Sequence, residues 1–261
     1  MNFSSLFGVV FGIGVMYSAL KATTDNMGFF LDMHGILIVI GGTAAAASIS
    51  FPISHVLSMF KVFLMRVLGR NKVDYPEVIN QLLELNKKAA MGVTTLNESL
   101  GHIRHDFLKE ATALVSSGVL SEREIRAALE QRLKTIESRY MQEANMFRVI
   151  GRFPPAFGLL GTTLGMITLL QKIGQPDSQK LIGPSMSIGL IATLYGIGLA
   201  NLIFIPIAEN LTERTEEEMA LRRMIVEGVI MIKAQVNPIA MRETMNSYLL
   251  PKDRINRKKA A

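Results

Sequence analysis

The stretch that decides the fold is Pro184-SMSIGLIATLYGIGLANLIFIPI-Ala208, in which no Asp, Glu, Lys, Arg or His interrupts the apolar run. A helix needs roughly 20 mainly apolar residues to cross the hydrocarbon core of a bilayer. Glycine and alanine recur along the stretch, and small residues let membrane helices approach closely. The run therefore predicts a membrane-spanning helix that packs tightly against other helices.

Three further runs without charged residues are long enough to cross a bilayer. They are Ser4 to Leu20, Gly35 to Ile53 and Phe153 to Leu170. The fold class predicted is an all-α membrane protein with four transmembrane helices. About a hundred residues separate the second and third runs, and about fifty follow the fourth, so we expect a helical cytoplasmic domain and a cytoplasmic C-terminal helix.

The distribution of basic residues predicts the orientation of the chain. Those that flank the runs on the side of the long segments are Lys61, Arg66, Arg70, Arg148, Arg152 and Arg214. The two short loops between paired runs carry only Lys21, Lys172 and Lys180. The positive-inside rule therefore places both termini and the long segment in the cytoplasm, with the short loops on the opposite side of the membrane. The expected segments are 1–53, 54–152, 153–209 and 210–261.

Composition excludes several classes of protein. The chain has no cysteine, so it forms neither disulfides nor thiolate zinc sites. Its formal charge is +6, but the basic residues lie in segments that alternate with uncharged runs, which favours a membrane protein over a nucleic-acid-binding one. The first run begins at Phe3 without a basic leader and has no convincing cleavage site after it, so we expect a retained first span.

Helical patterns dominate the long segments. Apolar residues from Pro76 to Ala90 follow a period near 3.6, and the stretch from Ser121 to Tyr140 is rich in helix formers. Ser121 followed by Glu124 forms a capping-box pattern. A further amphipathic helix is predicted from Thr212 to Ala234.

The third and fourth runs are unusually rich in small and oxygen-bearing residues. The small ones are Gly158, Gly161, Gly165, Gly189, Ala192, Gly196 and Ala200, and the polar ones are Thr162, Thr163, Ser187, Thr193, Tyr195 and Asn201. Ordinary helix packing accounts for the glycines. The hydroxyl groups either bond to their own backbone carbonyls or offer oxygens that suit a hard cation or water.

The four runs contain no Asp, Glu, Lys, Arg or His, which limits what the chain can do alone. Ion transfer through hydrocarbon normally requires an ionisable group. Either the chain conducts nothing, or a partner helix supplies a carboxylate and this chain supplies the polar wall. An enzyme active at membrane depth would need a base, paired carboxylates or metal ligands there, so we do not expect an enzyme.

Several runs of sequence resemble the MotA and PomA family of flagellar stator proteins. The matching runs are Met27-GFFL-Asp32, Ile36-LIVIGG-Thr43, Pro155-AFGLLG-Thr162, Ala192-TLY-Gly196 and Phe204-IPI-Ala208. The resemblance implies a ring of five A-type subunits around two B-type (MotB/PomB) subunits, whose helices carry an essential aspartate. It also implies that influx of Na+ or H+ turns the ring against the rotor protein FliG, with no cofactor. The same resemblance implies a location in the bacterial inner membrane, with the short loops in the periplasm.

The resemblance also assigns roles to residues. Thr162 and Thr193 match positions that line the ion site, and Asp32 matches an acidic residue linked to ion entry. Pro155 and Pro206 match two prolines that couple ion flow to rotation; on the sequence alone, both could simply bend helices to aid packing. A threonine at Thr162 favours sodium over protons.

The rotor-facing charges depart from the family pattern. Ala89 and Ala90 occupy positions that are commonly basic, and Asn97 replaces an acidic residue. The resemblance leaves Lys87, Lys88, Glu98 and Arg104 as candidate rotor contacts, although a solvated helix face accounts for them equally well. His102 and His105 share a spacing that could bind a metal, but only Asp106 lies nearby, so no metal site is expected.

Two alternatives stay open for the function. An ion-driven energiser of the ExbB and TolQ type also works through a partner's aspartate, but it typically has three spans. A membrane scaffold that conducts nothing is also compatible, because the partner's carboxylate lies outside this sequence.

Overall fold

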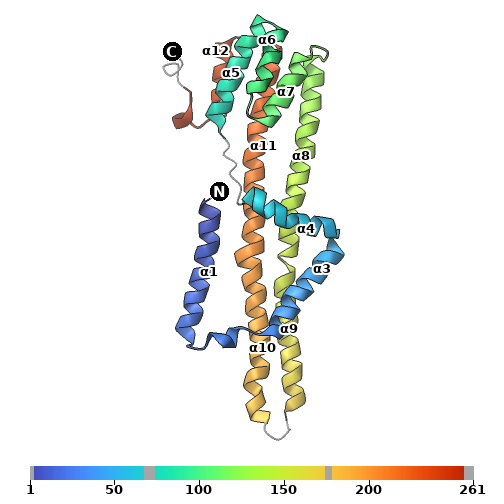
Figure 1. Ribbon diagram of the computed structural model, residues 1–261, viewed down its shortest axis with the longest axis vertical. Coiled ribbons are helices and arrows are strands. Elements are labelled where there is room, and N and C mark those ends of the chain that lie inside the picture. The colour runs from blue at the N-terminus through green and yellow to red at the C-terminus, as the bar shows by residue number, and fades with distance from the viewer. Residues whose placement is uncertain (1–2, 68–73, 174–177, 256–261) are drawn as a thin grey trace. The chain divides into compact units, whose positions relative to one another are not determined.

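The computed structural model describes residues 3–67, 74–173 and 178–255, and every regular element in these ranges is helical (Figure 1). Arg70, residues 174–177 of the second predicted loop, the Lys180 side chain and residues 256–261 of the tail lie outside the described part. The all-α prediction is confirmed for the described chain. Contacts divide the chain into two compact units, with boundaries at 71/72, 139/140 and 213/214.

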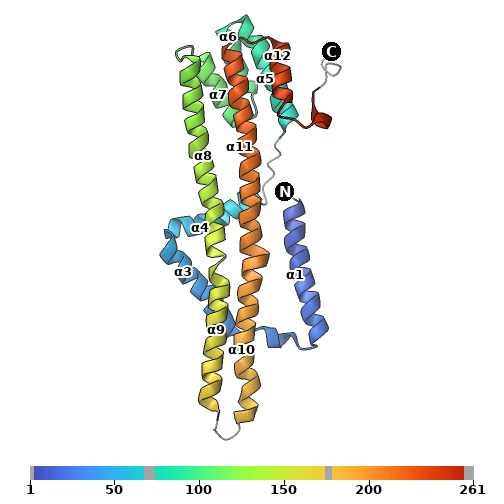
Figure 2. The same ribbon diagram turned by 180° about the vertical axis from the view of Figure 1, so that it is seen from behind.

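The first unit comprises residues 1–71 and 140–213. Its elements are α1 (Phe3–Thr23), η1 (Met27–Phe30), α2 (Met33–Ile36), η2 (Leu37–Gly41), α3 (Gly42–Ser50), α4 (Ile53–Val62), η3 (Phe63–Val67), α9 (Phe153–Lys172), α10 (Ser178–Leu199) and η5 (Ala200–Phe204). The elements η2, η3 and η5 are wide π-helical turns. In both views α9 and α10 run side by side, so these two antiparallel helices form the centre of the unit (Figure 2).

The second unit comprises residues 72–139 and 214–261. Its elements are α5 (Tyr75–Met91), α6 (Val93–Glu98), η4 (Ser99–His102), α7 (Asp106–Ser116), α12 (Pro238–Asn246) and η6 (Pro251–Asp253). Two long helices, α8 (Glu122–Ile150) and α11 (Ile205–Lys233), contribute to both units. The unit's core contains fully buried apolar side chains that include Leu82, Leu108, Leu129, Met224 and Ile225.

Local signals in the sequence explain where several helices begin. Glu124 accepts hydrogen bonds from the backbone N–H and hydroxyl group of Ser121, at 2.8 and 2.7 Å, which confirms the predicted capping box. Asp74 caps α5 by accepting from the N–H of Glu77 at 3.1 Å, and proline follows in the first turn. The predicted helices 76–90 and 121–140 correspond to α5 and to the first part of α8.

Three helical segments of the described chain are long and apolar enough to cross a membrane: Met27–Ser50, Glu122–Lys172 and Ile182–Lys233. They contain the third and fourth predicted runs in full and the second up to Ser50, so residues 51–53 of the second run lie outside its segment. The first predicted run lies in α1, of which Val10–Thr23 is a shorter apolar helix by the same criteria. The chain is therefore a multi-pass membrane protein, while the segment boundaries predicted at the membrane surfaces stay a prediction.

Candidate ion-pathway site

The glycines of α9 and α10 let the two helices touch backbone to backbone. A Cβ atom added at Gly189 would lie 2.7 Å from the Cα atom of Thr162, and one at Gly196 would lie 2.4 Å from the carbonyl oxygen of Pro154. Real side chains do not tolerate such distances, so only glycine fits. Similar limits hold at Gly158, Gly161 and Gly165. This approach is the close packing that the small residues predicted.

This packing brings the hydroxyl groups of Thr162 and Thr193 together, with their oxygens 2.5 Å apart. The Thr162 oxygen also lies 2.9 Å from the carbonyl oxygen of Gly189 and 3.3 Å from that of Gly158. The Thr193 oxygen lies 3.2 Å from each of the same two carbonyls. The four oxygens form one cluster, in which each hydroxyl group meets a carbonyl of both helices.

The cluster has more acceptors than donors. Two hydroxyl protons serve five oxygen–oxygen contacts, so at any moment most of these contacts have no hydrogen between them. Threonine hydroxyl and backbone carbonyl oxygens are ligands that suit hard cations or water. Both threonines are half-buried, and the arrangement can accept a cation or a proton donor.

The other polar residues of the two helices are placed differently. Thr163 is exposed and donates to its own helix at Leu159, and Asn201 donates to Ile197. The Tyr195 hydroxyl group donates to the carbonyl oxygen of Phe30, outside the cluster. Of the oxygen-bearing side chains singled out in the sequence, the structure brings Thr162 and Thr193 together in the cluster.

Asp32 lies at the start of α2 and is held there by two helices. Its side chain caps α2 by accepting from the N–H of Gly35 at 2.7 Å, and its own backbone N–H donates to the Tyr195 hydroxyl group of α10 at 3.2 Å. The Nδ1 atom of His34 lies 3.5 Å from the carboxylate. Asp32 therefore connects the loop before α2 to α10.

The two prolines singled out in the sequence have different places in their helices. Pro155 falls in the first turn of α9, where a missing N–H leaves no hydrogen bond unmade, and its Cα atom is 3.1 Å from a Cβ position at Gly196. Pro206 lies inside the continuous helical segment Ile182–Lys233, two residues after the π-helical turn η5 ends at Phe204. Since proline cannot donate, it breaks the regular bonding pattern here, in keeping with the wide turn.

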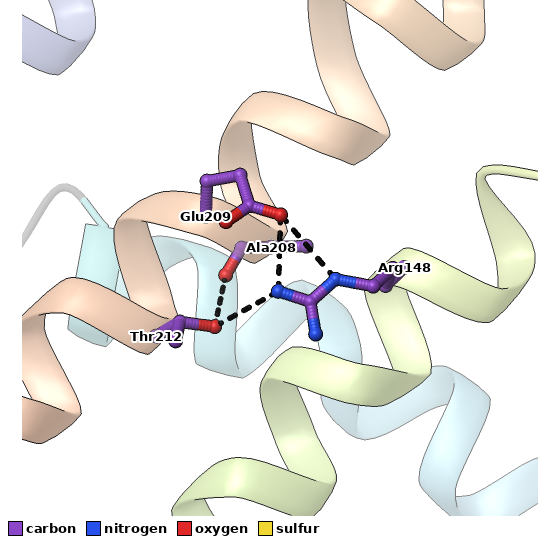
Figure 3. A network of polar contacts seen from close by, with 4 residues as sticks. All are labelled: Arg148, Ala208, Glu209 and Thr212. Atoms are coloured by element: carbon purple, nitrogen blue, oxygen red, sulfur yellow. Dashed lines mark hydrogen bonds and ion pairs between the residues drawn. The ribbon is translucent and has the colours of Figure 1, made fainter.

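Beyond the Arg152 end of α9, a polar network joins the last turns of α8 to the first turns of α11 (Figure 3). The Arg148 guanidinium donates to one carboxylate oxygen of Glu209 at 3.0 and 3.3 Å and to the Thr212 hydroxyl group at 3.3 Å. Thr212 in turn donates to the carbonyl oxygen of Ala208. The sequence identified Arg148 as a flanking charge but gave no signal for its partners, because they lie 61 and 64 residues away.

An apolar cluster lies in the same part of the first unit as this network. Its buried members are Ala47, Met59, Ala144, Met146, Phe147, Ile150, Ile207, Ala208 and Leu211. Arg66 adds a second tie to α8, because it donates to Glu143 at 2.9 Å and lies 3.8 Å above the centre of the Tyr140 ring. Together these contacts fix α4 and η3 against α8 and α11.

The candidate rotor contacts lie in the second unit. Lys87 is exposed and Lys88 half-buried on α5, while Glu98 is exposed at the end of α6. Arg104 forms an exposed ion pair with Glu77, with 3.1 Å between nitrogen and oxygen. The structure does not gather these four residues into a single site through any described contact.

Burial and hydrogen bonds shift the pKa values of two titratable groups in the second unit. His105 caps α7 by accepting from the N–H of Leu108 at 3.3 Å, and burial together with the nearby Arg222 lowers the pKa of the imidazole. Glu227 accepts two hydrogen bonds from Arg126, at 2.6 and 3.1 Å, which lower the pKa of that carboxyl group. In the described chain no group of three His, Asp or Glu side chains is arranged to hold a metal ion.

Comparisons with known proteins identify the family. Residues 99–224 match the MotA/TolQ/ExbB proton channel family. The chain is 32% identical over 257 residues to Motility protein A of Borreliella burgdorferi, a match that covers 97% of this chain and 96% of that protein. It is 30% identical over 250 residues to chemotaxis protein PomA of Vibrio alginolyticus, covering 95% of this chain and 96% of PomA.

A solved structure has the same fold. The structure of C. jejuni MotAB superposes with a TM-score of 0.87 at 25% identity, covering 98% of this chain and 100% of that chain. The chain therefore belongs to the MotA and PomA group of the MotA/TolQ/ExbB proton channel family, whose stator subunits are ion-channel and motor components and not enzymes.

Proposed function

We propose that this chain is the A-type subunit of a flagellar stator, which couples influx of Na+ or H+ to torque on the rotor. The observation that carries the proposal is the cluster of four oxygens around Thr162 and Thr193, set in helices whose membrane-crossing runs contain no Asp, Glu, Lys, Arg or His. Such a cluster can take an ion but cannot complete its pathway. The likeness to the chain in the MotAB complex of C. jejuni supports a B-type partner, and the family resemblance implies that this partner supplies the missing carboxylate as an essential aspartate.

The proposed topology is that of an inner-membrane protein with four spans and with both termini in the cytoplasm. The first span is α1, whose exposed apolar side chains include Phe7, Val10, Phe11 and Ile13, at 56–61% of their surface. Lipid or a neighbouring helix covers such a surface at lower cost than water. The basic residues beside the long segments support the orientation.

The proposed assembly is a ring of five copies around two B-type subunits. Large apolar side chains remain exposed on the outer faces of α9 and α10, among them Leu159 at 66%, Leu170 at 63% and Leu190 at 61%. Copies of the chain, the partner's helices and lipid divide this surface. The second unit pushes the rotor protein FliG, through exposed charges such as Lys87, Lys88, Glu98 and Arg104.

Proposed roles for the remaining family positions follow from their places in the fold. Pro155 packs against α10 one to two turns from the cluster, and Pro206 lies beside the apolar cluster between α8 and α11. Both positions suit residues that pass a movement of the spans along α8 and α11. Asp32, tied to α10 through Tyr195, suits a role in ion entry.

The proposed coupling ion is sodium. The Thr162 hydroxyl group contacts both carbonyls of the cluster, so its oxygen is placed to replace part of an ion's hydration shell. Removing this oxygen by Thr162→Ala would leave Thr193 and two carbonyls, a poorer set of ligands.

The test is the speed of single motors in cells that rely on this subunit and its partner. External sodium is varied at constant proton-motive force, for the wild type and for Thr162→Ala. We expect speed to rise and saturate with sodium, and the variant to need more sodium for half-maximal speed. Speed that ignores sodium but falls with an uncoupler would make the motor proton-driven, and absence of any rotation with a cognate partner would overturn the stator assignment.

A further inference from the structure

Thr43 is a buried hydroxyl group without a hydrogen-bond partner in α3. Its side chain is 7% exposed, and its Oγ1 atom makes no hydrogen bond within the described chain. Buried polar atoms are almost always paired, since leaving one unpaired is costly. A buried hydroxyl group without a hydrogen-bond partner inside a membrane span therefore requires an explanation.

Neighbouring hydroxyl groups on the same helix behave in the ordinary way. Ser48 donates to Ala44 and Ser50 to Ala46, each four residues back at 2.8 Å. Thr43 does not make the corresponding bond to Val39. The π-helical turn η2 ends two residues before Thr43 and has already changed the register of this part of the helix, where the N–H of Gly42 bonds to Ile38 and Val39. Such turns recur at functional sites.

The position of Thr43 relative to the oxygen cluster follows from two contacts between this helix and α9. A Cβ position at Gly161 lies 3.8 Å from Ile38, and one at Gly42 lies 2.3 Å from the ring of Phe157. Ile38 is thus level with Gly161, the residue beside Thr162, and Gly42, the residue beside Thr43, is level with Phe157. Thr43 is five residues beyond Ile38, so it lies about 7.5 Å, or one to two helical turns, along the axis from the level of Gly161, on the side of the α9 N-terminus.

The buried residues of the second span form one stripe that includes Thr43. The stripe consists of Gly35, Val39, Thr43 and Ala47, spaced by four residues. Gly35 faces Ala192 of α10, and Ala47 joins the apolar cluster near the end of α8. Thr43 is the polar member between these ends, and the helix that carries it packs against α9, with its neighbour Gly42 facing Phe157.

We propose that the Thr43 hydroxyl group is a further binding position on the ion pathway, one to two turns beyond the Thr162 and Thr193 cluster. In the orientation proposed above, this is the cytoplasmic side of the cluster. The hydroxyl group binds the water that accompanies the ion as it leaves the cluster. Binding of this water requires a hydroxyl group that is not already hydrogen-bonded to another protein atom. The inference rests on the proposed stator function and adds a residue on a different helix.

The test compares Thr43→Val with Thr43→Ser in the single-motor assay. Valine keeps the shape of the side chain and removes only the hydroxyl group, whereas serine keeps the hydroxyl group. The matched control is Thr163→Val, at an exposed threonine that already donates to Leu159. Thermal unfolding of each purified variant is measured alongside.

The expected pattern separates a pathway role from a structural one. Thr43→Val should lower motor speed at limiting ion concentration about five-fold, the loss of roughly one hydrogen bond, without lowering the unfolding midpoint. Thr43→Ser and Thr163→Val should keep near-normal speed. A Thr43→Val motor with normal speed, or one whose speed falls only together with its unfolding midpoint, would overturn the inference. A wild type that drives no motor would instead refute the stator function itself.

Discussion

Replacing Gly189 by alanine should separate α9 from α10 by about 1 Å. The new Cβ atom would lie 2.7 Å from the Cα atom of Thr162, whereas carbon atoms pack best at about 3.5–4.0 Å. Both atoms belong to or adjoin the backbone, so no side-chain rotation relieves the clash. A shift of this size would lengthen the 2.5 Å contact between the hydroxyl oxygens of Thr162 and Thr193 beyond a good hydrogen bond.

The matched control is Gly198→Ala, on the same helix, where a Cβ atom meets nothing within 4 Å. Overpacking costs about 1–3 kcal/mol, while a glycine-to-alanine change at an unhindered helical site gains about 0.5–1 kcal/mol. Both sites lie in the same helix, so that gain applies to each variant, and Gly189→Ala should be about 1–3 kcal/mol less stable than Gly198→Ala. Unfolding of the purified protein in one detergent, followed by circular dichroism, measures the difference, and motor speed reports the damage to the cluster. Equal stability and equal speed of the two variants would refute the packing explanation.

Three further predictions concern charged groups outside the spans. Because the folded-state pKa of His105 lies below its ordinary value of 6.5, the stabilisation from its helix cap should be complete above pH 6.5 and lost as pH falls through the lowered pKa. Asparagine still caps a helix but does not titrate, so His105→Asn should flatten this pH dependence of stability. Unfolding curves recorded over a pH series measure the effect. Glu227→Gln should cost at most about 1 kcal/mol near neutral pH, and the difference from wild type should vanish on acidification below the lowered pKa of Glu227, since a half-exposed pair with Arg126 is weak. Arg148→Gln should cost about 0.5–1 kcal/mol at low salt, and 1 M salt should reduce the cost, because Glu209 is well exposed; an unchanged cost at high salt would point to packing and not charge.

Sequence patterns predicted those elements that depend on short-range chemistry. Three of the four uncharged runs lie in helical segments long and apolar enough to cross a membrane. The spacing of Ser121 and Glu124 predicted the start of α8. Both signals are local, because each is contained in one short stretch of sequence. The small residues of α9 and α10 indicated close packing, and the structure shows how close. The meeting of Thr162 with Thr193 could be expected only through the family resemblance, since 31 residues separate them.

Other features left no readable signal. The π-helical turns η2 and η5 depend on how the ladder of backbone bonds adjusts to tertiary contacts and to Pro206, and an apolar run looks the same with or without such a turn. The partners of Arg148 and Asp32 are distant in the chain. Sequence reasoning did not single out Thr43, and the reason is informative. A threonine inside a span ordinarily donates to the carbonyl four residues back, and only the structure reveals that Thr43 does not.

The surplus of acceptors in the oxygen cluster explains why a chain with uncharged spans can still belong to an ion-driven machine. Two protons shared among four oxygens leave lone pairs that neither helix satisfies. A partner's carboxylate brings more acceptors and no donor when ionised, so carboxylate and cluster together are stable only with a cation or a proton between them. Before assembly, this chain buries no charge in its spans and inserts at little electrostatic cost. The ionisable group that ion transfer requires is supplied when the partner's helix packs against this chain, so we expect ion binding to depend on both chains. Thr162→Ala should weaken ion binding without preventing either chain from inserting into the membrane.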